Sequence, residues 1–189
     1  MSPFPDSFTT DRLQAERLTA DHFAELQRMH RDPAVMVHLG GVRDDERTAA
    51  YLARNLQHWA DHGFGLWILR ERGGGEPIGR AVLRHLSVDG VDEVEVGYGF
   101  YQRFWGRGLA TEVTKACLTL GRHHLGLGSI VAVTAPANLA SQHVLQKAGL
   151  ACEREFVFEG TPSLLFRTTA ASWTTHSRGN RSHATGTPE

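Results

Sequence analysis

The chain has 189 residues, 41% of them hydrophobic, and its 20 basic and 21 acidic side chains give a net charge of −1. This length and apolar content fit one domain with a buried core, and the balanced charge disfavours a nucleic-acid-binding protein. Cys117 and Cys152 form neither a disulfide framework nor a zinc pattern, so we expect a reducing, cytoplasmic setting. No signal peptide and no membrane-spanning apolar run is recognisable, so we expect no membrane contact.

The first half of the chain predicts one strand, two helices and three more strands. Loose alternation over residues 12–19 indicates a strand, and apolar spacing indicates a helix over 19–31. A second helix is predicted over 45–62, with Gly63 placed to end it. Three strands separated by glycine-containing turns are expected at 64–72, 77–88 and 92–100.

The second half predicts a helix over 108–125, a buried strand over 129–135 and a short helix over 138–149. A final hairpin follows in "CEREFVFEG" and "SLLFRTTAA". We expect the folded domain to occupy residues 1–174. Residues 175–189 are almost all polar, which predicts a disordered C-terminal tail.

This order of elements predicts an α+β (mixed α/β) domain. Its central sheet is expected to be mostly antiparallel and twisted, with about seven strands flanked by about four helices. The order is not the regular strand–helix alternation of a dinucleotide-binding fold.

The stretch "QRFWGRGLAT" joins the strand at 92–100 to the helix at 108–125. Gly106 and Gly108 remove two Cβ atoms where the chain enters the helix, so backbone N–H groups can converge on an anion. Arg103 and Arg107 add positive charge. The pattern indicates either a phosphate cradle or a plain tight turn, and Gly-x-Gly alone does not choose between them.

Three blocks, in the correct order, resemble the GNAT superfamily of N-acetyltransferases. "RFWGRG" is similar to its Arg/Gln-x-x-Gly-x-Gly/Ala signature, "NLASQHVLQKAGL" to its Asn-x-x-Ser segment, and "VEVGYGF" to its Glu-Ile-Gly-Tyr strand. The element order agrees over about residues 9–173. The branch most resembled is named for ribosomal-protein alanine and serine N-acetyltransferases.

The resemblance implies that the chain uses acetyl-CoA as its cosubstrate. It also implies that the strands at 92–100 and 129–135 splay apart around the cofactor, and that Asn138 either contacts it or simply caps a helix. The residues implied for cofactor binding are Tyr98, Gly99, Phe100, Arg103, Gly106, Arg107, Gly108, Leu109, Ala110, Thr111, Asn138 and Ser141.

Two residues are candidates for the chemistry. Glu95 could take a proton from the amine nucleophile, or it could be a solvated or salt-bridged strand residue. Ser141 could hydrogen-bond the leaving thiolate, or it could bond only its own backbone. Many members of the superfamily place a tyrosine where this sequence has Leu145, so an acid role at that position is in doubt.

These residues predict an acetyl-CoA-dependent N-acetyltransferase that acts on a primary amine, either a protein N-terminus or a small molecule, by direct attack in a ternary complex. A non-catalytic acyl-CoA-binding or partner-binding module is the alternative, and a ribosome- or nucleic-acid-binding protein is disfavoured by charge. The histidines lack ligand spacing, so no metal is expected. The acceptor stays open, as does the choice between monomer and homodimer.

Overall fold

The computed structural model describes residues 4–168, so the predicted boundary at residue 174 and the predicted tail lie outside the described residues. A single eight-stranded sheet runs in the order β1-β2-β3-β4-β5-β6-β8-β7. In chain order the strands are β1 (Ser7–Thr9), β2 (Leu13–Arg17), β3 (Leu66–Glu71), β4 (Gly79–Val88), β5 (Val91–Phe100), β6 (Val131–Thr134), β7 (Leu150–Phe158) and β8 (Thr161–Thr168).

The described residues also form five α-helices and two 3₁₀ turns. The helices are α1 (Phe23–His30), α2 (Pro33–Met36), α3 (Asp45–His62), α4 (Leu109–Leu125) and α5 (Leu139–Ala148). The 3₁₀ turns span Ala20–His22 and Gln102–Phe104. None of the helices in residues 4–168 has the length and apolar character needed to cross a membrane.

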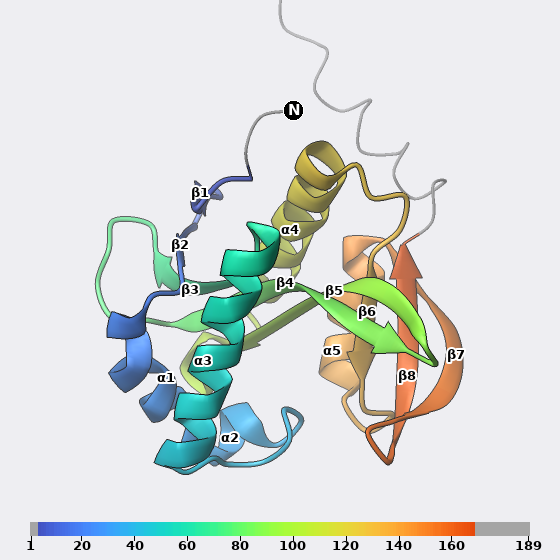
Figure 1. The fold of residues 1–189 in the computed structure, drawn as a ribbon, viewed down its shortest axis with the longest axis horizontal. Helices are drawn as coiled ribbons and strands as arrows, with labels where there is room; N and C mark the ends of the chain where they lie inside the picture. The colour runs from blue at the N-terminus through green and yellow to red at the C-terminus, as the bar shows by residue number, and fades with distance from the viewer. Residues whose placement is uncertain (1–3, 169–189) are drawn as a thin grey trace, which may run out of the picture.

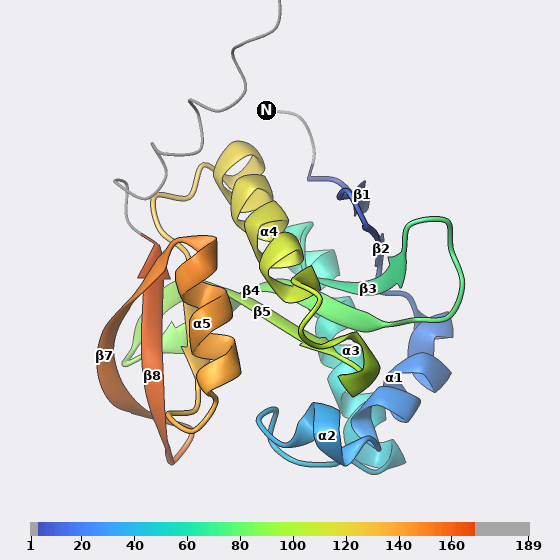
Figure 2. The ribbon, with the colours of Figure 1, turned by 180° about the vertical axis from the view of Figure 1, so that it is seen from behind.

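Helices cover both faces of the sheet. Helices α1, α2 and α3 lie on the side that faces the viewer in Figure 1, and α4 and α5 lie on the opposite side, in front in Figure 2. Strand alternation explains the two layers: Leu66 and Ile68 of β3 pack in a cluster with Tyr51 of α3, whereas Trp67 and Leu69 pack in the larger core.

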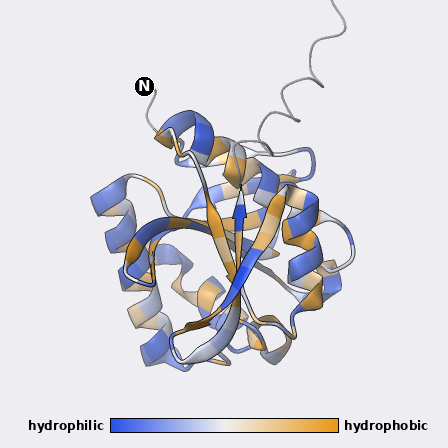
Figure 3. Cartoon of the chain, turned by 90° about the vertical axis from the view of Figure 1, so that its right-hand side faces the viewer, coloured by the Kyte–Doolittle hydropathy of each residue, from blue (hydrophilic) through white to orange (hydrophobic). Residues whose placement is uncertain are grey.

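The sheet divides between β5 and β6. Strands β4 and β5 pair in continuous register over their whole length, but β5 and β6 pair only at Glu95 and Val131, in parallel. The second part of the sheet, β6-β8-β7, is seen from its outer side in Figure 3. The mostly antiparallel, splayed sheet predicted from the sequence is therefore confirmed.

Two elements were not predicted, which raises the counts to eight strands and five helices. Strand β1 has three residues, too few to show an alternating pattern, and pairing with β2 defines it. Helix α2 begins at Pro33, where Asp32 accepts hydrogen bonds from the N–H groups of Ala34 and Val35. Aspartate followed by proline is a recognised helix start, but a four-residue helix is too short to show an apolar period.

His30, at the end of α1, is a fully buried histidine. Its Nδ1 lies 3.0 Å from Thr48 Oγ1, and its Nε2 lies 3.3 Å from an Arg43 nitrogen. Burial, together with the charges of Arg80 and Arg43, lowers the pKa of His30 to about 3. His30 is therefore neutral in the folded protein over the whole range in which an exposed histidine titrates.

We expect acid to destabilise the fold through His30. Below pH 6.5 the unfolded chain gains a proton at this residue, and the folded chain does not until about pH 3. Stability is therefore lost as the pH falls, by about 2 kcal/mol between pH 7 and pH 5. Urea unfolding of His30→Gln should show a smaller pH dependence over this interval, whereas exposed His38→Gln should behave as the wild type. Equal pH dependence in both variants would contradict this account.

Candidate active site

The start of α4 is left without a side-chain cap. Asp32, Asp44 and Asn138 each accept a backbone hydrogen bond at the start of α2, α3 and α5. Helix α4 instead has Gly108 at its N-cap, with φ 77°, and no side chain to satisfy its first N–H groups. The first backbone bond of the helix runs from Glu112 N–H to Gly108 C=O, so the N–H groups of residues 109–111 have no intrahelical partner. This geometry is suited to an anion.

The first side chain of this turn is buried. Leu109 is 2% exposed and belongs to the main core, so it offers only its backbone. Gly106 also has a positive φ, 73°, and an added Cβ would meet nothing within 4 Å. The predicted residues Gly106, Gly108, Leu109, Ala110 and Thr111 therefore lie together at one helix start.

Arg12, which the sequence analysis did not single out, holds this loop in place. Its Nη1 donates to the backbone carbonyl of Arg107 at 2.7 Å, and its Nη2 lies 2.6 Å from Glu112 Oε2. Glu112 also accepts hydrogen bonds from the Arg12 backbone N–H and the Thr10 hydroxyl. Burial raises the pKa of Glu112, but these hydrogen bonds and the charge of Arg12 outweigh it and lower the pKa. The contacts join the β1–β2 turn to the start of α4.

We expect Arg12→Ala to weaken acetyl-CoA binding about tenfold, because the loop loses the hydrogen bond to the Arg107 carbonyl and the ion pair with Glu112. Isothermal titration calorimetry measures this directly. Arg17→Ala is the matched control, since Arg17 forms an exposed ion pair with Asp6, remote from α4 in sequence and in sheet position. Unchanged affinity in Arg12→Ala would show that the loop keeps its shape without Arg12.

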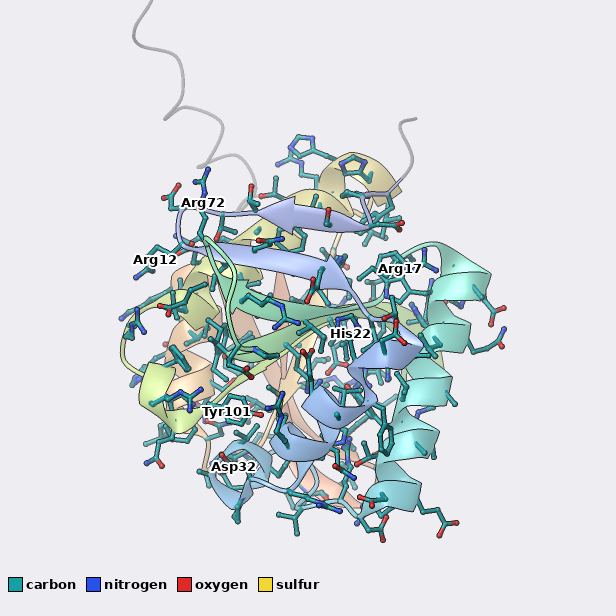
Figure 4. The ribbon with its side chains drawn as sticks, turned by 90° about the vertical axis from the view of Figure 1, so that its left-hand side faces the viewer. Arg12, Arg17, His22, Asp32, Arg72 and Tyr101 are labelled. Carbon is teal, nitrogen blue, oxygen red and sulfur yellow. The ribbon has the colours of Figure 1, made fainter. Side chains whose placement is uncertain are left out.

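The two arginines of the predicted cradle have different surroundings. Arg107 forms an ion pair with Glu71, Nη2 to Oε1 2.7 Å, so part of its charge is already neutralised. Arg103 lies over the rings of Tyr101 and Phe104, 5.5 and 5.0 Å from their centroids. It also lines a cavity of about 220 Å³ together with Arg28, Glu76, Pro77 and Tyr101. Figure 4 shows Tyr101 near Asp32. Burial is the main cause of the raised pKa of Tyr101, and the charge of Asp32 acts in the same direction.

The phase of the β4–β5 pairing decides which backbone groups of β5 are free. Leu83 of β4 donates its N–H to the carbonyl of Gly65 on the β3 side. The residues next to Leu83, and every second residue from there along β4, therefore direct their backbone groups towards β5. Their partners in β5 are Glu95, Gly97 and Gly99. The N–H groups of Tyr98 and Phe100 therefore point towards β6, beyond the place where β5 and β6 separate. The Phe100 carbonyl on this edge accepts a hydrogen bond from Trp105 Nε1 at 2.8 Å.

The face of β5 that carries Glu95, Gly97 and Gly99 is closely packed at its two glycines. A Cβ on Gly99 would lie 3.2 Å from Leu39, and a Cβ on Gly97 would lie 3.1 Å from Val82. Leu39 and Val82 therefore already line the space beside the two glycines closely.

Tyr98 and Ser141 meet across the β5–α5 boundary. The Tyr98 hydroxyl lies 2.9 Å from Ser141 Oγ, and the Ser141 N–H donates to Asn138 Oδ1 at 3.0 Å. Burial raises the pKa of Tyr98 to about 12, although the hydrogen bond to Ser141 acts in the opposite direction. The phenol is therefore protonated at neutral pH and can donate a proton. Leu145 is buried in the core, 1% exposed.

Glu95 lies where the two parts of the sheet separate, and it is 7% exposed. Arg84, its partner residue in β4, donates from Nε to Glu95 Oε2 at 2.7 Å. The charge of Glu95 is the largest cause of the raised pKa of Arg84. Of the two interpretations left open by the sequence, the salt bridge is observed, and it leaves the second carboxylate oxygen outside this bond.

Cys117 does not supply a nucleophile. It is fully buried, and burial raises the pKa of its thiol to about 12. Two further side chains that the sequence analysis missed, Tyr51 and Arg80, form a hydrogen bond of 2.6 Å behind β5. The signal was present for Arg80, because an arginine inside the apolar run "PIGRAVL" alternates with Val82, which packs in the same cluster as Tyr51.

The chain matches a family of known proteins. A family profile described as an acetyltransferase (GNAT) domain matches residues 12–151. The uncharacterized protein YkkB of Bacillus subtilis is 32% identical over 119 residues, which cover 63% of this chain and 69% of YkkB. An FsC-acetyl coenzyme A-N(2)-transacetylase of Aspergillus fumigatus is 28% identical over 150 residues, 75% of this chain and 63% of that protein. The match thus spans less than two thirds of the fungal enzyme.

Solved structures share the fold. An acetyltransferase from Agrobacterium tumefaciens superposes with a TM-score of 0.76 at 24% identity, covering 85% of this chain and 92% of its own. The aminoglycoside acetyltransferase AAC(6')-Ib in complex with coenzyme A gives 0.74 at 16% identity, covering 87% and 99%. At these identities the likeness is one of fold. The family profile, in contrast, extends from the β1–β2 turn into β7, and on that ground the chain belongs to the GNAT family of acetyltransferases.

Proposed function

We propose that this member of an acetyltransferase family transfers the acetyl group of acetyl-CoA to a primary amine, by direct attack in a ternary complex. The observation that carries the proposal is the uncapped start of α4 beside the split between β5 and β6. The names of two relatives, an acetyl coenzyme A transacetylase and an acetyltransferase bound to coenzyme A, support the same donor.

The residues present fit coenzyme A. The N–H groups of residues 109–111 at the start of α4 would hold its pyrophosphate, aided by the helix dipole and by Arg103. The free edge of β5 offers the N–H groups of Tyr98 and Phe100 as hydrogen-bond donors to the pantetheine arm. Bound acetyl-CoA supplies an acetyl thioester, whose carbonyl oxygen gains negative charge when an amine attacks. N–H donors on this edge would stabilise that charge.

Glu95 is proposed to take the proton that the amine must lose. An ammonium group cannot attack, and freeing an α-amine or a lysine at pH 7 costs roughly 1.4 or 4.6 kcal/mol. The guanidinium of Arg84 holds the carboxylate through one oxygen, Oε2. The second oxygen of Glu95 can accept the proton directly or through a water molecule.

Ser141 and Tyr98 are proposed to serve the departing thiolate. Their hydroxyl groups lie 2.9 Å apart, and the Asn138 side chain fixes the backbone of Ser141 at the start of α5. A phenol that stays protonated can donate a hydrogen bond to Ser141, whose own hydroxyl can then donate one to the thiolate. A thiol has a pKa near 8.5, so hydrogen bonding alone is also enough to assist its departure.

The test has two parts. Calorimetry should first show that acetyl-CoA binds to the purified chain. Release of free thiol, followed with a chromogenic disulfide, should then accompany turnover on a panel of small amines and N-terminal peptides. Binding of acetyl-CoA without turnover on any amine would favour a non-catalytic acyl-CoA-binding module instead.

A further inference from the structure

Arg80 of β4 is a buried cation without an anionic partner. It is 5% exposed, and its Nε has no hydrogen-bond partner. Its Nη1 donates to the hydroxyl of Tyr51 at 2.6 Å. Within residues 4–168, no carboxylate forms an ion pair with this guanidinium. Removing a charge from water without pairing it is unfavourable, so the chain itself does not satisfy this group.

Two more arginines surround the same tyrosine. The guanidinium carbons of Arg43, Arg80 and Arg54 lie 4.7, 5.2 and 5.9 Å from the centroid of the Tyr51 ring. None of the three has a salt-bridge partner among the residues described. Burial lowers the pKa of Arg43; Tyr51 acts in the opposite direction, and the charges of the neighbouring arginines add to the effect of burial. His30, bonded to Arg43, stays neutral. The cluster therefore carries an uncompensated positive charge.

The cluster borders the reactive part of β5. Arg80 pairs with Gly99, and its Nε lies 4.0 Å from where a Cβ of Gly99 would be. Gly97 lies two residues further, about 7 Å along the strand, and Glu95 two residues beyond it. Exposure decreases from Arg54, which is exposed, through Arg43 to buried Arg80. The positive charge thus extends from the surface to the sheet.

The phosphates of coenzyme A do not account for this cluster. Arg80 bonds to Tyr51 of α3, and α3 covers the face of the sheet opposite to α4, where the uncapped helix start lies. An acceptor approaching from the α3 side would meet the cluster, because Glu95, Gly97 and Gly99 present that same face.

We propose that the acceptor of this enzyme is an amine that also carries a carboxylate roughly 10 Å away from it, which Arg80, Arg43 and Arg54 bind while the amine lies near Glu95. This inference rests on the proposed N-acetyltransferase function. A guanidinium with a free Nε–H suits a carboxylate, because planar donors match two oxygens. A polycationic acceptor, such as the aminoglycosides of AAC(6')-Ib, is disfavoured by the same charges.

The experiment compares matched acceptors. Tripeptides with a free C-terminus and the corresponding C-terminal amides present the same amine, with and without a carboxylate about 10 Å away. Peptides with aspartate or asparagine at position 2 test whether a peptide side chain supplies the carboxylate instead. We expect kcat/KM to be at least about tenfold higher for the carboxylate member of a pair. Equal or higher values for the amides would overturn the proposal.

Variants of Arg80 test whether this residue causes the preference for carboxylate acceptors. Arg80→Met removes the charge and keeps an apolar side chain of similar length, and it should lower kcat/KM for carboxylate acceptors about 30-fold while changing amides little. Arg80→Lys keeps the charge and should retain part of the preference. Arg70→Gln is the control, because Arg70 is already paired with Glu16 and Glu25, and it should keep the full preference. If Arg80→Met keeps the preference for carboxylate acceptors, another part of the protein must cause that preference.

Failure of the two proposals can be told apart. If acetyl-CoA does not bind the wild-type chain in calorimetry, the proposed function fails. If it binds and neutral amines are acetylated as well as carboxylates, only the inference about Arg80 fails. Thermal melting of the CoA-saturated protein with the free tripeptides gives a readout without turnover: the rise in Tm should be present in the wild type and lost in Arg80→Met. No rise in the wild type would count against the carboxylate site.

Discussion

Replacing Gly108 by aspartate is expected to abolish measurable acetyl-CoA binding while leaving the protein folded. The helix start of α4 has no cap of its own, so an aspartate at this N-cap would place its carboxylate on the N–H groups that the pyrophosphate needs. The carboxylate would also repel the phosphates. We expect the Kd to rise by at least about 100-fold, measured by calorimetry.

The control is Gly108→Asn, which has nearly the same shape and no charge. Both side chains tolerate the left-handed conformation that φ 77° requires better than other residues do. An added Cβ would lie 3.5 Å from Arg12 Nη2, which is an ordinary contact. The Gly108→Asn variant should therefore bind acetyl-CoA more tightly than Gly108→Asp does. Both variants should have a Tm near that of the wild type. Wild-type affinity in Gly108→Asp would mean that the phosphates bind elsewhere.

Glu95→Gln should lower kcat about 100-fold near pH 7, because glutamine cannot accept the proton of the amine. The deficit should shrink as the pH approaches the pKa of the acceptor, since the amine is then neutral without a base. Steady-state rates over a range of pH measure this. A constant deficit at every pH would indicate that Glu95 binds or positions the substrate and does not act as the base.

Removing Glu95 also leaves Arg84 without its buried partner, and this has to be separated from catalysis. Arg84→Gln breaks the same ion pair but keeps the carboxylate. If the pair matters only for the fold, the two variants should lose similar stability in urea and similar activity. A much larger loss of activity in Glu95→Gln, with the pH dependence above, identifies the role of the carboxylate.

Local signals were sufficient for the longer elements. The helix predicted over residues 45–62 has those bounds, because the Asp44 cap, the apolar spacing and Gly63 all lie within its own sequence. Helix α5 was likewise marked at both ends, by Asn138 and Gly149. Strand β1 was missed because only its pairing with β2 makes it a strand.

The candidate site divides in the same way. Gly106, Gly108 and Asn138 were found because glycine at a helix start and asparagine at an N-cap act within a few residues of chain. Arg12 was not found, because its partner Glu112 is 100 residues away. The bond between Tyr98 and Ser141 also joins residues far apart in sequence, 43 positions from each other.

The sequence by itself determined the order of the elements, the glycine loop at the start of α4 and the alternation that places Glu95 with Gly97 and Gly99, because each depends on neighbours along the chain. Only the tertiary structure decided which charges are paired. Arg107 meets Glu71, Glu95 meets Arg84, and Arg80 meets no carboxylate among the described residues. Ion pairing depends on distance through space and on burial, and neither is set until the strands and helices have packed.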